Sequence, residues 1–380
     1  MLRVSGRKNP TWLLPAILAA AVLAAYIPAA RTITAIRLLA VIRRVASADI
    51  NKLPSVQEAK IVRYMGLSEE EAMLYRPSGA EPKSGVVLIA GVSELGCYHP
   101  RLVSLSRALA QSGFLVLTPD IRMLREFKIY PPPFDEISFW LHEVPKLEGA
   151  RRLRHVGLAG ISFSGTLALL AAAQPRNWNL VAYVLGIGCF DDLNRCSRFW
   201  FGAGPVTVGP GYYPTRYYAR WVMMLAAVDM LPSPDDREFL ETALRNLLLQ
   251  KQVSSPRAGV TGEGLRWYHL ATMPEDQADP ELATRIGSQI AARLYPHLGT
   301  DQLAHELRCP IFLAHGAYDD LILPEESRAL HQKINEVPSY LLISPFLTHT
   351  HPWEKPLRWT TRTAAVFDLF LFFYHLAGAI

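Results

Sequence analysis

Cysteine is scarce in this sequence of 380 residues, and its four cysteines show no paired C-x-x-C spacing. That absence argues against a zinc or redox site, and nothing else in the sequence suggests a metal or an organic cofactor. Buried free thiols are the interpretation that we favour. A disulfide between Cys189 and Cys196, in an oxidising compartment, stays open as the alternative.

Acidic residues are missing from the first 48 positions, which hold seven basic ones. Once these are subtracted, 39 − 7 = 32 basic residues stand against 34 acidic ones, so the remaining body is mildly acidic although the whole chain has a net charge of +5. Such a body gives no reason to expect nucleic acid as a partner. Hydrophobic residues make up 50% of the chain, which excludes global disorder.

Charge of either sign is missing from Trp12 to Ala30. As a helix, these 19 residues would span about 28 Å, close to the thickness of about 30 Å of the hydrocarbon core of a bilayer. We therefore predict a single uncleaved membrane anchor. A cleaved signal peptide and a helix buried in protein are the alternatives. Basic residues flank the stretch on both sides, so the side of the membrane stays open.

A helix is also predicted for Thr32 to Ala48, with Leu38 and Val41 on an apolar stripe and arginines away from it. Two interpretations stay open, a helix that lies on an anionic lipid surface and a plain stalk. The C-terminal residues Ala364 to Ile380 are apolar too, but two ionisable side chains interrupt them. They favour a helix packed on a sheet over a second membrane span.

Strand-like and helix-like segments alternate through the rest of the chain. Lys60 to Met65 and Ala72 to Arg76 are predicted to form an antiparallel hairpin at a sheet edge. Further strands are expected at Val86 to Ala90, Phe114 to Thr118, the segment before Ser162, Leu180 to Ile187, Pro310 to Ala314 and Tyr340 to Ile343. Helices are expected between them, which predicts an α/β fold with a mostly parallel sheet covered on both faces.

Residues 191–308 break this alternation, because they carry helical patterns and an aromatic cluster but no buried-strand signal. We predict a membrane anchor with its basic helix at residues 1–50, an α/β core at 51–190 and 309–380, and a helical cap or lid at 191–308. The aromatic side chains have two possible roles. They form the core of the insertion, or they cover the mouth of an active site and select an apolar part of the substrate.

One serine stands where a nucleophile would be expected. The residues up to Ile161 read as an apolar strand, Ser162 lies on a tight turn, and an Ala/Leu-rich helix follows. Gly160 and Ser164, two residues before and after this serine, are small enough for a sharp turn. The strand would carry Ser162 to the edge of a sheet, and the start of the helix would offer N–H groups to an oxyanion.

An activated serine needs a base, and the base needs a carboxylate. The loop after Pro310 to Ala314 offers Asp319, with Asp320 as the alternate, and the loop after Tyr340 to Ile343 offers His349, with His351 as the alternate. Both loops should meet Ser162 at the carboxyl ends of the strands. We expect His315 to be a turn residue, and the other histidines, such as His99, His142 and His269, to be surface or helix positions and not ligands.

The strand, turn and helix around Ser162, the stretch His315-Gly316-Ala317-Tyr318-Asp319 and the order Ser, Asp, His resemble the α/β-hydrolase superfamily. The resemblance covers roughly Lys60 to Ile380, apart from the insertion. It implies that Asp319 is the acid and that the backbone N–H groups of Phe163 and Val92 form the oxyanion hole.

The sequence departs from the pattern of this superfamily at three places. Ala90 stands in place of a usual histidine, Ser164 in place of a usual glycine, and Pro324 comes one position late, which keeps Asp320 open. No departure removes a reactive group.

The resemblance implies a serine hydrolase that cleaves a carboxylic ester or thioester through an acyl-enzyme, similar to carboxylesterases and lipases. The expected substrate is a small-molecule or lipid ester, and the expected location is a membrane. An acyltransferase with the same triad is one alternative. A catalytically silent scaffold tethered to the membrane is the other, because a fold does not fix a function.

Overall fold

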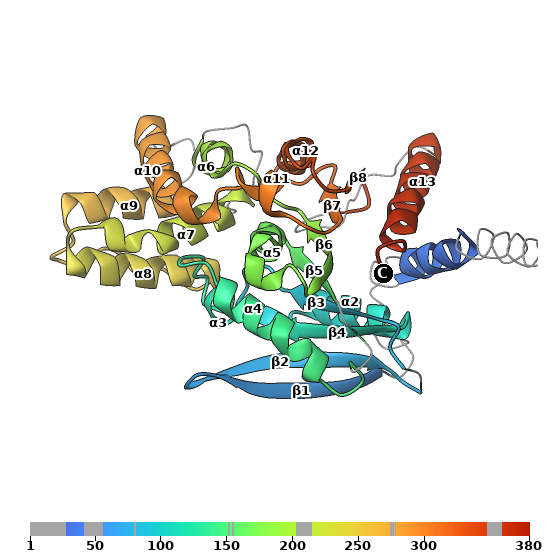
Figure 1. Cartoon of the computed structure of the whole chain (residues 1–380). Coiled ribbons are helices and arrows are strands. Elements are labelled where there is room, and N and C mark those ends of the chain that lie inside the picture. Colours follow the sequence, from blue (N-terminus) through green and yellow to red (C-terminus); the bar gives the residue numbers. More distant parts are fainter. Residues whose placement is uncertain are drawn as a thin grey trace, which may run out of the picture.

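The computed structural model describes residues 28–41, 56–79, 81–150, 153, 156–202, 215–273, 277, 279–347 and 359–380. At its centre lies an eight-stranded sheet with the order β1-β2-β4-β3-β5-β6-β7-β8 (Figure 1). Strand β2 is antiparallel to both of its neighbours, and every other pair is parallel. The predicted mostly parallel sheet and its edge hairpin are therefore confirmed.

The strands are short, and those at the centre are the most deeply buried. They are β1 (Val56–Met65), β2 (Ser68–Pro77), β3 (Ser84–Ile89), β4 (Phe114–Pro119), β5 (Val156–Ile161), β6 (Val181–Ile187), β7 (Ile311–Gly316) and β8 (Ser339–Ser344). Every residue of β3, β4 and β7 is buried, whereas β1 has no buried residue. Strands covered on both faces need continuous apolar runs, and this is why the sequence revealed them.

Helices cover both faces of the sheet. They include α2 (Pro100–Gln111), α3 (Arg122–Arg125), α4 (Phe134–Glu143), α5 (Phe163–Ala173), α12 (Pro324–Lys333) and α13 (Trp359–Leu376), with short 3₁₀ turns at Gly96–Tyr98, Val144–Lys146 and Pro175–Asn177. Along β3, Val87 and Ile89 belong to one apolar cluster with α4, α5 and α12, whereas Val86 and Leu88 belong to a second cluster with α2, α13 and the helix at residues 28–41. The alternation of side chains along a strand separates the two clusters.

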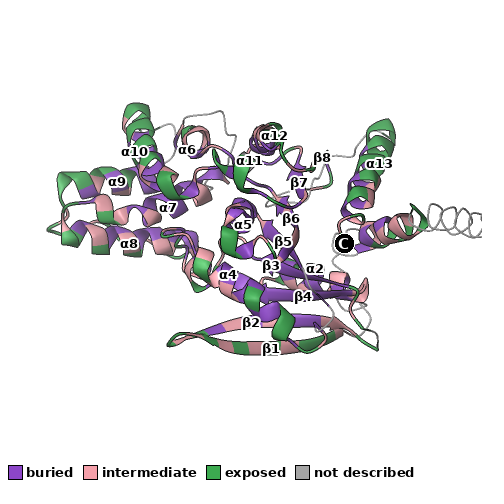
Figure 2. Ribbon diagram, in the orientation of Figure 1, coloured by how far each residue is buried: buried purple, intermediate pink, exposed green. Residues whose placement is uncertain are grey.

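Between β6 and β7, the described residues form helices and no strand. These helices are α6 (Leu193–Phe201), α7 (Arg216–Ala226), α8 (Pro234–Leu248), α9 (Gly262–Thr272), α10 (Pro280–Leu298) and α11 (Leu303–Glu306), with a 3₁₀ turn at Val228–Met230. Trp200, Tyr217 and Trp221 are buried among them. Figure 2 shows buried stretches along α7 and α8. Part of the aromatic cluster therefore forms the core of this helical region, which lies at the opposite end of the molecule from α13 (Figure 1).

The helix at residues 28–41 and the C-terminal helix α13 lie together on the second face of the sheet. The C-terminal helix α13 packs on it, as predicted, and the helix at residues 28–41 buries Leu38 in the same apolar cluster. Val41 is buried as well, so the described part of the predicted stripe is covered by protein. Of the predicted anchor, only residues 28–30 lie within the described ranges. None of the described helices combines the length and apolarity that a membrane crossing requires.

All four cysteines are free and buried, which confirms the favoured interpretation and leaves Cys189 and Cys196 unpaired. Burial raises the pKa of the Cys189 and Cys309 thiols to about 12, so neither is a thiolate at neutral pH.

Candidate active site

Ser162 lies on a strained turn between β5 and α5. Its backbone has a φ of 62° and a ψ of −133°, a conformation that a side-chain-bearing residue rarely adopts. A Cβ at Gly160 would collide with the carbonyl oxygen of Ser164, and a Cβ at Gly165 would lie 2.7 Å from Cys189 Sγ. The small residues that flank the serine are thus required by the close approach of strand and helix. This is the geometry of a nucleophile elbow.

The loop after β3 passes directly beside this elbow. A Cβ at Gly91 would lie 3.5 Å from the Cβ of Ser162, and Ser164 Oγ donates a 2.6 Å hydrogen bond to the carbonyl oxygen of Ala90. Two of the departures from the superfamily pattern are therefore in contact with each other. Phe163 is the first residue of α5, where backbone N–H groups have no intrahelical acceptor. Among the described residues, neither its N–H nor that of Val92 has an acceptor.

The loop after β7 holds a buried carboxylate. Asp319 Oδ1 accepts hydrogen bonds from the backbone N–H groups of Leu321, at 3.0 Å, and Ile322, at 2.9 Å. Its Oδ2 lies 3.4 Å from His315 Nε2. Asp320 is exposed instead, and its Oδ2 accepts a 2.8 Å hydrogen bond from Thr215 Oγ1. The two neighbouring aspartates thus have different environments.

The prediction that His315 is a turn residue is wrong. It belongs to β7, and its side chain is completely buried. Its Nε2 donates to the carbonyl oxygen of Ile322 at 2.8 Å, and its Nδ1 lies 2.7 Å from Ser327 Oγ. The ring therefore holds the loop after β7, called the acid loop below, through Nε2 and contacts α12 through Nδ1. These bonds explain a histidine at this position without a catalytic role.

Both predicted bases, His349 and His351, lie outside the described residues. The chain that leads to them is described as far as Leu347. A Cβ at Gly316 would lie 2.5 Å from the carbonyl oxygen of Leu347 and 3.6 Å from Asp319 Cβ. The segment before His349 therefore passes over the start of the acid loop.

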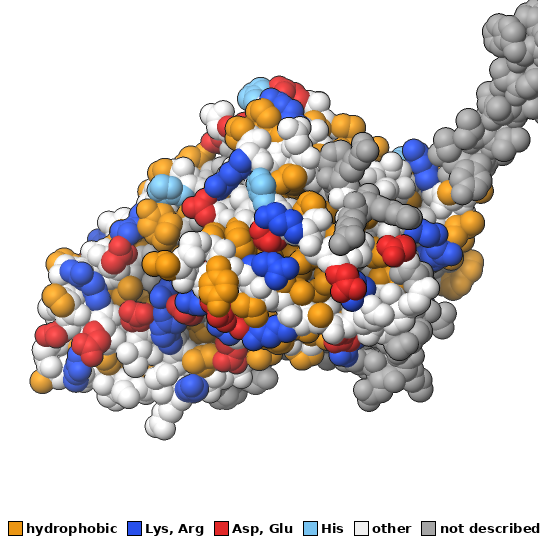
Figure 3. Space-filling model, turned by 60° about the horizontal axis from the view of Figure 1, so that its bottom comes forward, with side chains coloured by type: hydrophobic (Ala, Val, Ile, Leu, Met, Phe, Trp, Pro, Cys, Tyr) orange, Lys and Arg blue, Asp and Glu red, His pale blue; other side chains and the backbone are white. Residues whose placement is uncertain are grey.

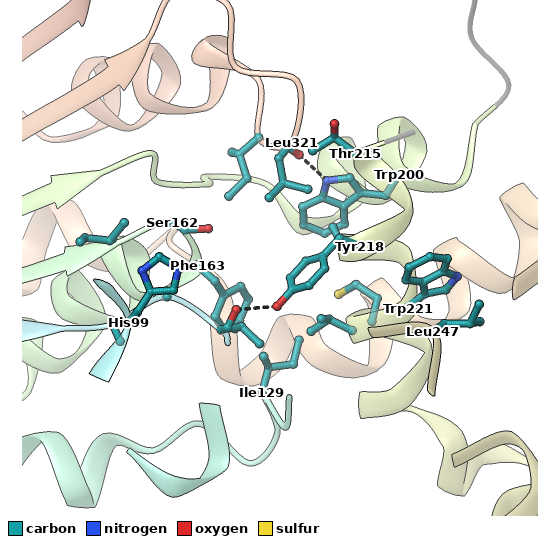
Figure 4. A pocket seen from close by; sticks show the side chains of 18 of the residues that line it. His99, Ile129, Ser162, Phe163, Trp200, Thr215, Tyr218, Trp221, Leu247 and Leu321 are labelled. Atoms are coloured by element: carbon teal, nitrogen blue, oxygen red, sulfur yellow. Dashed lines mark hydrogen bonds between the residues drawn. The ribbon is translucent and has the colours of Figure 1, made fainter. Parts of the chain in front are cut away.

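A cavity of about 810 Å³ lies between the sheet edge and the helical region, and Ser162 is part of its wall (Figure 4). Most of its lining residues are apolar, and helices α6, α7 and α8 supply the part of the wall that contains Trp200, Trp221 and Leu247. In Figure 4, Ser162 lies at one end of the cavity and Leu247 at the other. The space suits a substrate with an apolar group that extends away from the serine.

Hydrogen bonds connect the helical region to the loops around Ser162, and besides that of Thr215 to Asp320 two of them end on backbone carbonyls. Trp200 Nε1 donates to the carbonyl oxygen of Leu321 at 2.7 Å, and Tyr218 Oη donates to the carbonyl oxygen of Val92 at 2.7 Å (Figure 4). Burial raises the pKa of Tyr218 far above its ordinary value, so the phenol keeps its proton. The helical region thus contacts both the acid loop and the predicted oxyanion loop.

His99 was expected at a surface or helix position, and it does lie at the start of a helix, but it also forms part of the cavity wall, at the same end as Ser162 in Figure 4. It caps the N-terminus of α2, where its Nδ1 accepts a 3.3 Å hydrogen bond from the N–H of Arg101. Burial, followed by the charge of Arg101, lowers the pKa of His99, so the ring is neutral at pH 7. Its position after β3, at the same sheet edge as the serine, was a signal that could have identified it.

The described residues contain no group of three or more His, Cys, Asp or Glu side chains placed to hold a metal ion. The chemistry that they do support begins with the serine. A mostly parallel sheet with a serine on a strained turn between β5 and α5 is the mark of the α/β-hydrolase fold, and the chain has this fold.

The sequence matches no protein-family model, and no curated protein matches it. Solved structures are similar at low identity. The acylaminoacyl peptidase of Pyrococcus horikoshii is 12% identical, with a TM-score of 0.46, over 80% of this chain and 39% of that one. One of two fungal esterases from Rhizomucor miehei is 16% identical, with a TM-score of 0.46, over 92% and 91%. An esterase of Pyrobaculum calidifontis is 14% identical, with a TM-score of 0.45, over 89% of each chain. This chain thus spans about two fifths of the peptidase.

Proposed function

We propose that the protein is a serine hydrolase that cleaves a carboxylic ester or thioester through an acyl-enzyme. The observation that carries the proposal is the strained backbone of Ser162, with its φ of 62°, in the wall of a large cavity. Strain of this kind persists only where the surrounding structure enforces it, and it is concentrated at functional sites. A serine in an ordinary surface loop would not be held in this strained backbone conformation.

In the proposed reaction, His349 takes the proton of Ser162 Oγ while the oxygen attacks the carbonyl carbon of the ester. The N–H groups of Phe163 and Val92 stabilise the negative charge that forms on the carbonyl oxygen. The tetrahedral intermediate collapses, and His349 returns the proton to the departing alcohol or thiol. Water then attacks the acyl-enzyme by the same sequence of steps, which releases the acid and regenerates Ser162.

Asp319 is the proposed acid. Two backbone N–H groups fix its Oδ1, so that its side chain is held in one orientation, as a carboxylate that positions an imidazole must be. Asp320 is the weaker choice, because its exposed carboxylate is engaged by Thr215.

His349 is the proposed base because Leu347, two residues before it, lies against Gly316 at the start of the acid loop. His351 remains the alternate. His99 joins them as a third candidate, since it lines the cavity together with Ser162.

We further propose that the helical region acts as a cap that selects an apolar acyl or alcohol group, which the apolar lining supports. The N-terminal stretch Trp12 to Ala30 is proposed as a single-pass membrane anchor, on the strength of its length and lack of charge. The side of the membrane is left open.

The test is labelling of the full chain with a fluorophosphonate probe, which reacts with activated serines. Wild type should be labelled and Ser162→Ala should not, whereas Ser106→Ala, on α2 and outside the cavity lining, should be labelled like wild type. Labelling that survives Ser162→Ala would move the nucleophile elsewhere. No labelling of any variant would favour the silent scaffold.

The base is identified by ester hydrolysis with His349→Ala, His351→Ala and His99→Asn. The asparagine can still cap α2, so it removes the imidazole and spares the helix. Only the true base should lose about 10⁴-fold in kcat. If His99→Asn alone shows that loss, His99 is the base and the assignment of His349 is wrong.

A further inference from the structure

We propose that the outer face of α13, together with the outer face of the helix at residues 28–41, lies on the surface of a phospholipid bilayer. This surface is called the outer helix pair below. The proposal does not depend on hydrolase activity. It extends the N-terminal anchor proposed above, and the test separates the two.

Helix α13 has apolar side chains on both of its faces. Its inner face buries Leu369, Phe372 and Leu376 in the second apolar cluster, and the Phe372 ring makes an edge contact with Phe312 at 5.8 Å. The His375 ring stacks on Tyr340 of β8 at 4.5 Å. These contacts fix the helix on the sheet, so its outer face has a defined direction.

The outer face of α13 is also apolar. Its exposed large apolar residues are Val366, Phe367 and Leu371, and Phe370 and Tyr374 lie beside them, partly buried against the second apolar cluster. Val366 is 45% exposed, Phe367 60% and Leu371 38%, although large hydrophobic side chains of a soluble helix normally face its core. No charged residue interrupts this face, since Asp368 falls on its flank. Exposed apolar side chains that gather on one face of a helix are typical of a surface that a second apolar surface covers.

The helix at residues 28–41 repeats this pattern. Its inner face buries Ala35 and Leu38 with the apolar residues of α13. Its outer side exposes Ile33, at 52%, and Ile36, at 54%. The two helices share the second apolar cluster, and the segment just after α13 contacts the helix at residues 28–41, because a Cβ at Gly378 would lie 2.9 Å from the guanidinium carbon of Arg31. Figure 1 shows them together at the end of the molecule opposite the helical region.

The chain itself indicates that the cover is a bilayer. The uncharged stretch from Trp12 runs directly into the helix at residues 28–41, so that an anchor would deliver the outer helix pair to the membrane surface. This helix carries Arg31 and Arg37 and no acidic residue, which suits anionic headgroups. The face over β1 and β2 differs, because there charged side chains of both signs are interspersed (Figure 3).

The test uses single introduced cysteines in the full chain, since all four native cysteines are buried. Phe367→Cys and Ile36→Cys report on the outer helix pair. Leu67→Cys is the matched control, because Leu67 is an equally apolar but fully exposed residue in the β1–β2 turn. Each variant is labelled with a polarity-sensitive fluorophore and reconstituted in phosphatidylcholine vesicles, with and without phosphatidylglycerol. Quenching is measured with doxyl groups on the lipid chains and with iodide in the water.

The expected result is a several-fold loss of fluorescence with doxyl lipid at positions 36 and 367, stronger in the anionic vesicles, and quenching by iodide alone at position 67. Quenching of positions 36 and 367 by iodide, in protein that remains bound to vesicles, would leave the anchor in place and overturn this proposal. Protection from both quenchers would mean that protein covers the face, either a second copy or another part of the chain, and would overturn it as well. Fluorophosphonate labelling of the same samples reports separately on the hydrolase.

Discussion

The two walls of the cavity are built on different principles. The wall at the sheet edge is defined by backbone, because strand, turn and helix approach so closely at Gly160 and Gly165 that no side chain fits. The wall from the helical region is defined by side chains, with Trp200, Tyr218 and Trp221 as its largest members. The wall at the sheet edge would position the catalytic groups, and the wall from the helical region would determine which substrates fit.

The difference predicts how each wall responds to mutation. Close backbone approaches tolerate no added atom, so changes at the sheet edge should be severe and should affect every substrate alike. Side-chain walls can adjust, so changes there should be milder and should differ between substrates. The two walls meet at only a few hydrogen bonds, which include those of Trp200 and Tyr218 to backbone carbonyls.

The largest effect is expected at the acid. Asp319→Asn should lower kcat about 10⁴-fold for short and long esters alike, because the amide can still accept the hydrogen bonds from Leu321 and Ile322 but no longer stabilises an imidazolium. Asp320→Asn is the matched control and should change kcat by less than about threefold. The measurement is steady-state hydrolysis with the thermal unfolding of each variant alongside. Equal losses in the two variants would contradict the assignment of Asp319.

The next effect is on stability. Gly160→Ala should lower the free energy of unfolding by about 3 kcal/mol or more, because its Cβ would collide with the carbonyl oxygen of Ser164 in a segment that cannot move. Gly262→Ala is the control, since nothing lies within 4 Å of its Cβ position at the start of α9. That substitution should change stability by less than about 0.5 kcal/mol. Urea unfolding checks both, and a normal stability for Gly160→Ala would show that the elbow is less tightly packed than described.

The same contrast explains which parts could be predicted from the sequence. Buried parallel strands and a strained turn need particular residues at consecutive positions, so β3, β5 and the environment of Ser162 were predicted from short local patterns. The helices α6 and α9 were not predicted, because their burial depends on partners that are distant in the chain. The place of His99 in the cavity wall was missed although its position after β3 was a signal for it, because the rest of that wall comes from residues of the distant helical region.

The hydrogen bond that joins the two walls at Tyr218 gives the next prediction. Tyr218→Phe should lower kcat about tenfold with little change in KM, because the loop that carries Val92 loses a contact that holds it in place beside Ser162. Tyr217→Phe, on the same helix, removes a hydroxyl that donates to the carbonyl oxygen of Met273 at 3.2 Å, and should leave kcat within about twofold. A rise in KM alone for Tyr218→Phe would place the residue in substrate binding and not in the support of the oxyanion loop.

The smallest effect is expected at the far end of the cavity, where only apolar contact is lost. Leu247→Ala should lower kcat/KM for long acyl esters about tenfold and leave that for acetyl esters nearly unchanged, because a short chain would not reach this residue. Leu244→Ala, one helical turn earlier on α8, removes a buried leucine that does not line the cavity. It should reduce stability by about 2–5 kcal/mol without changing the ratio between long and short substrates. If the two variants change the ratio of kcat/KM between long and short esters equally, the helical wall does not select the substrate. The two walls would then differ only in how they are packed.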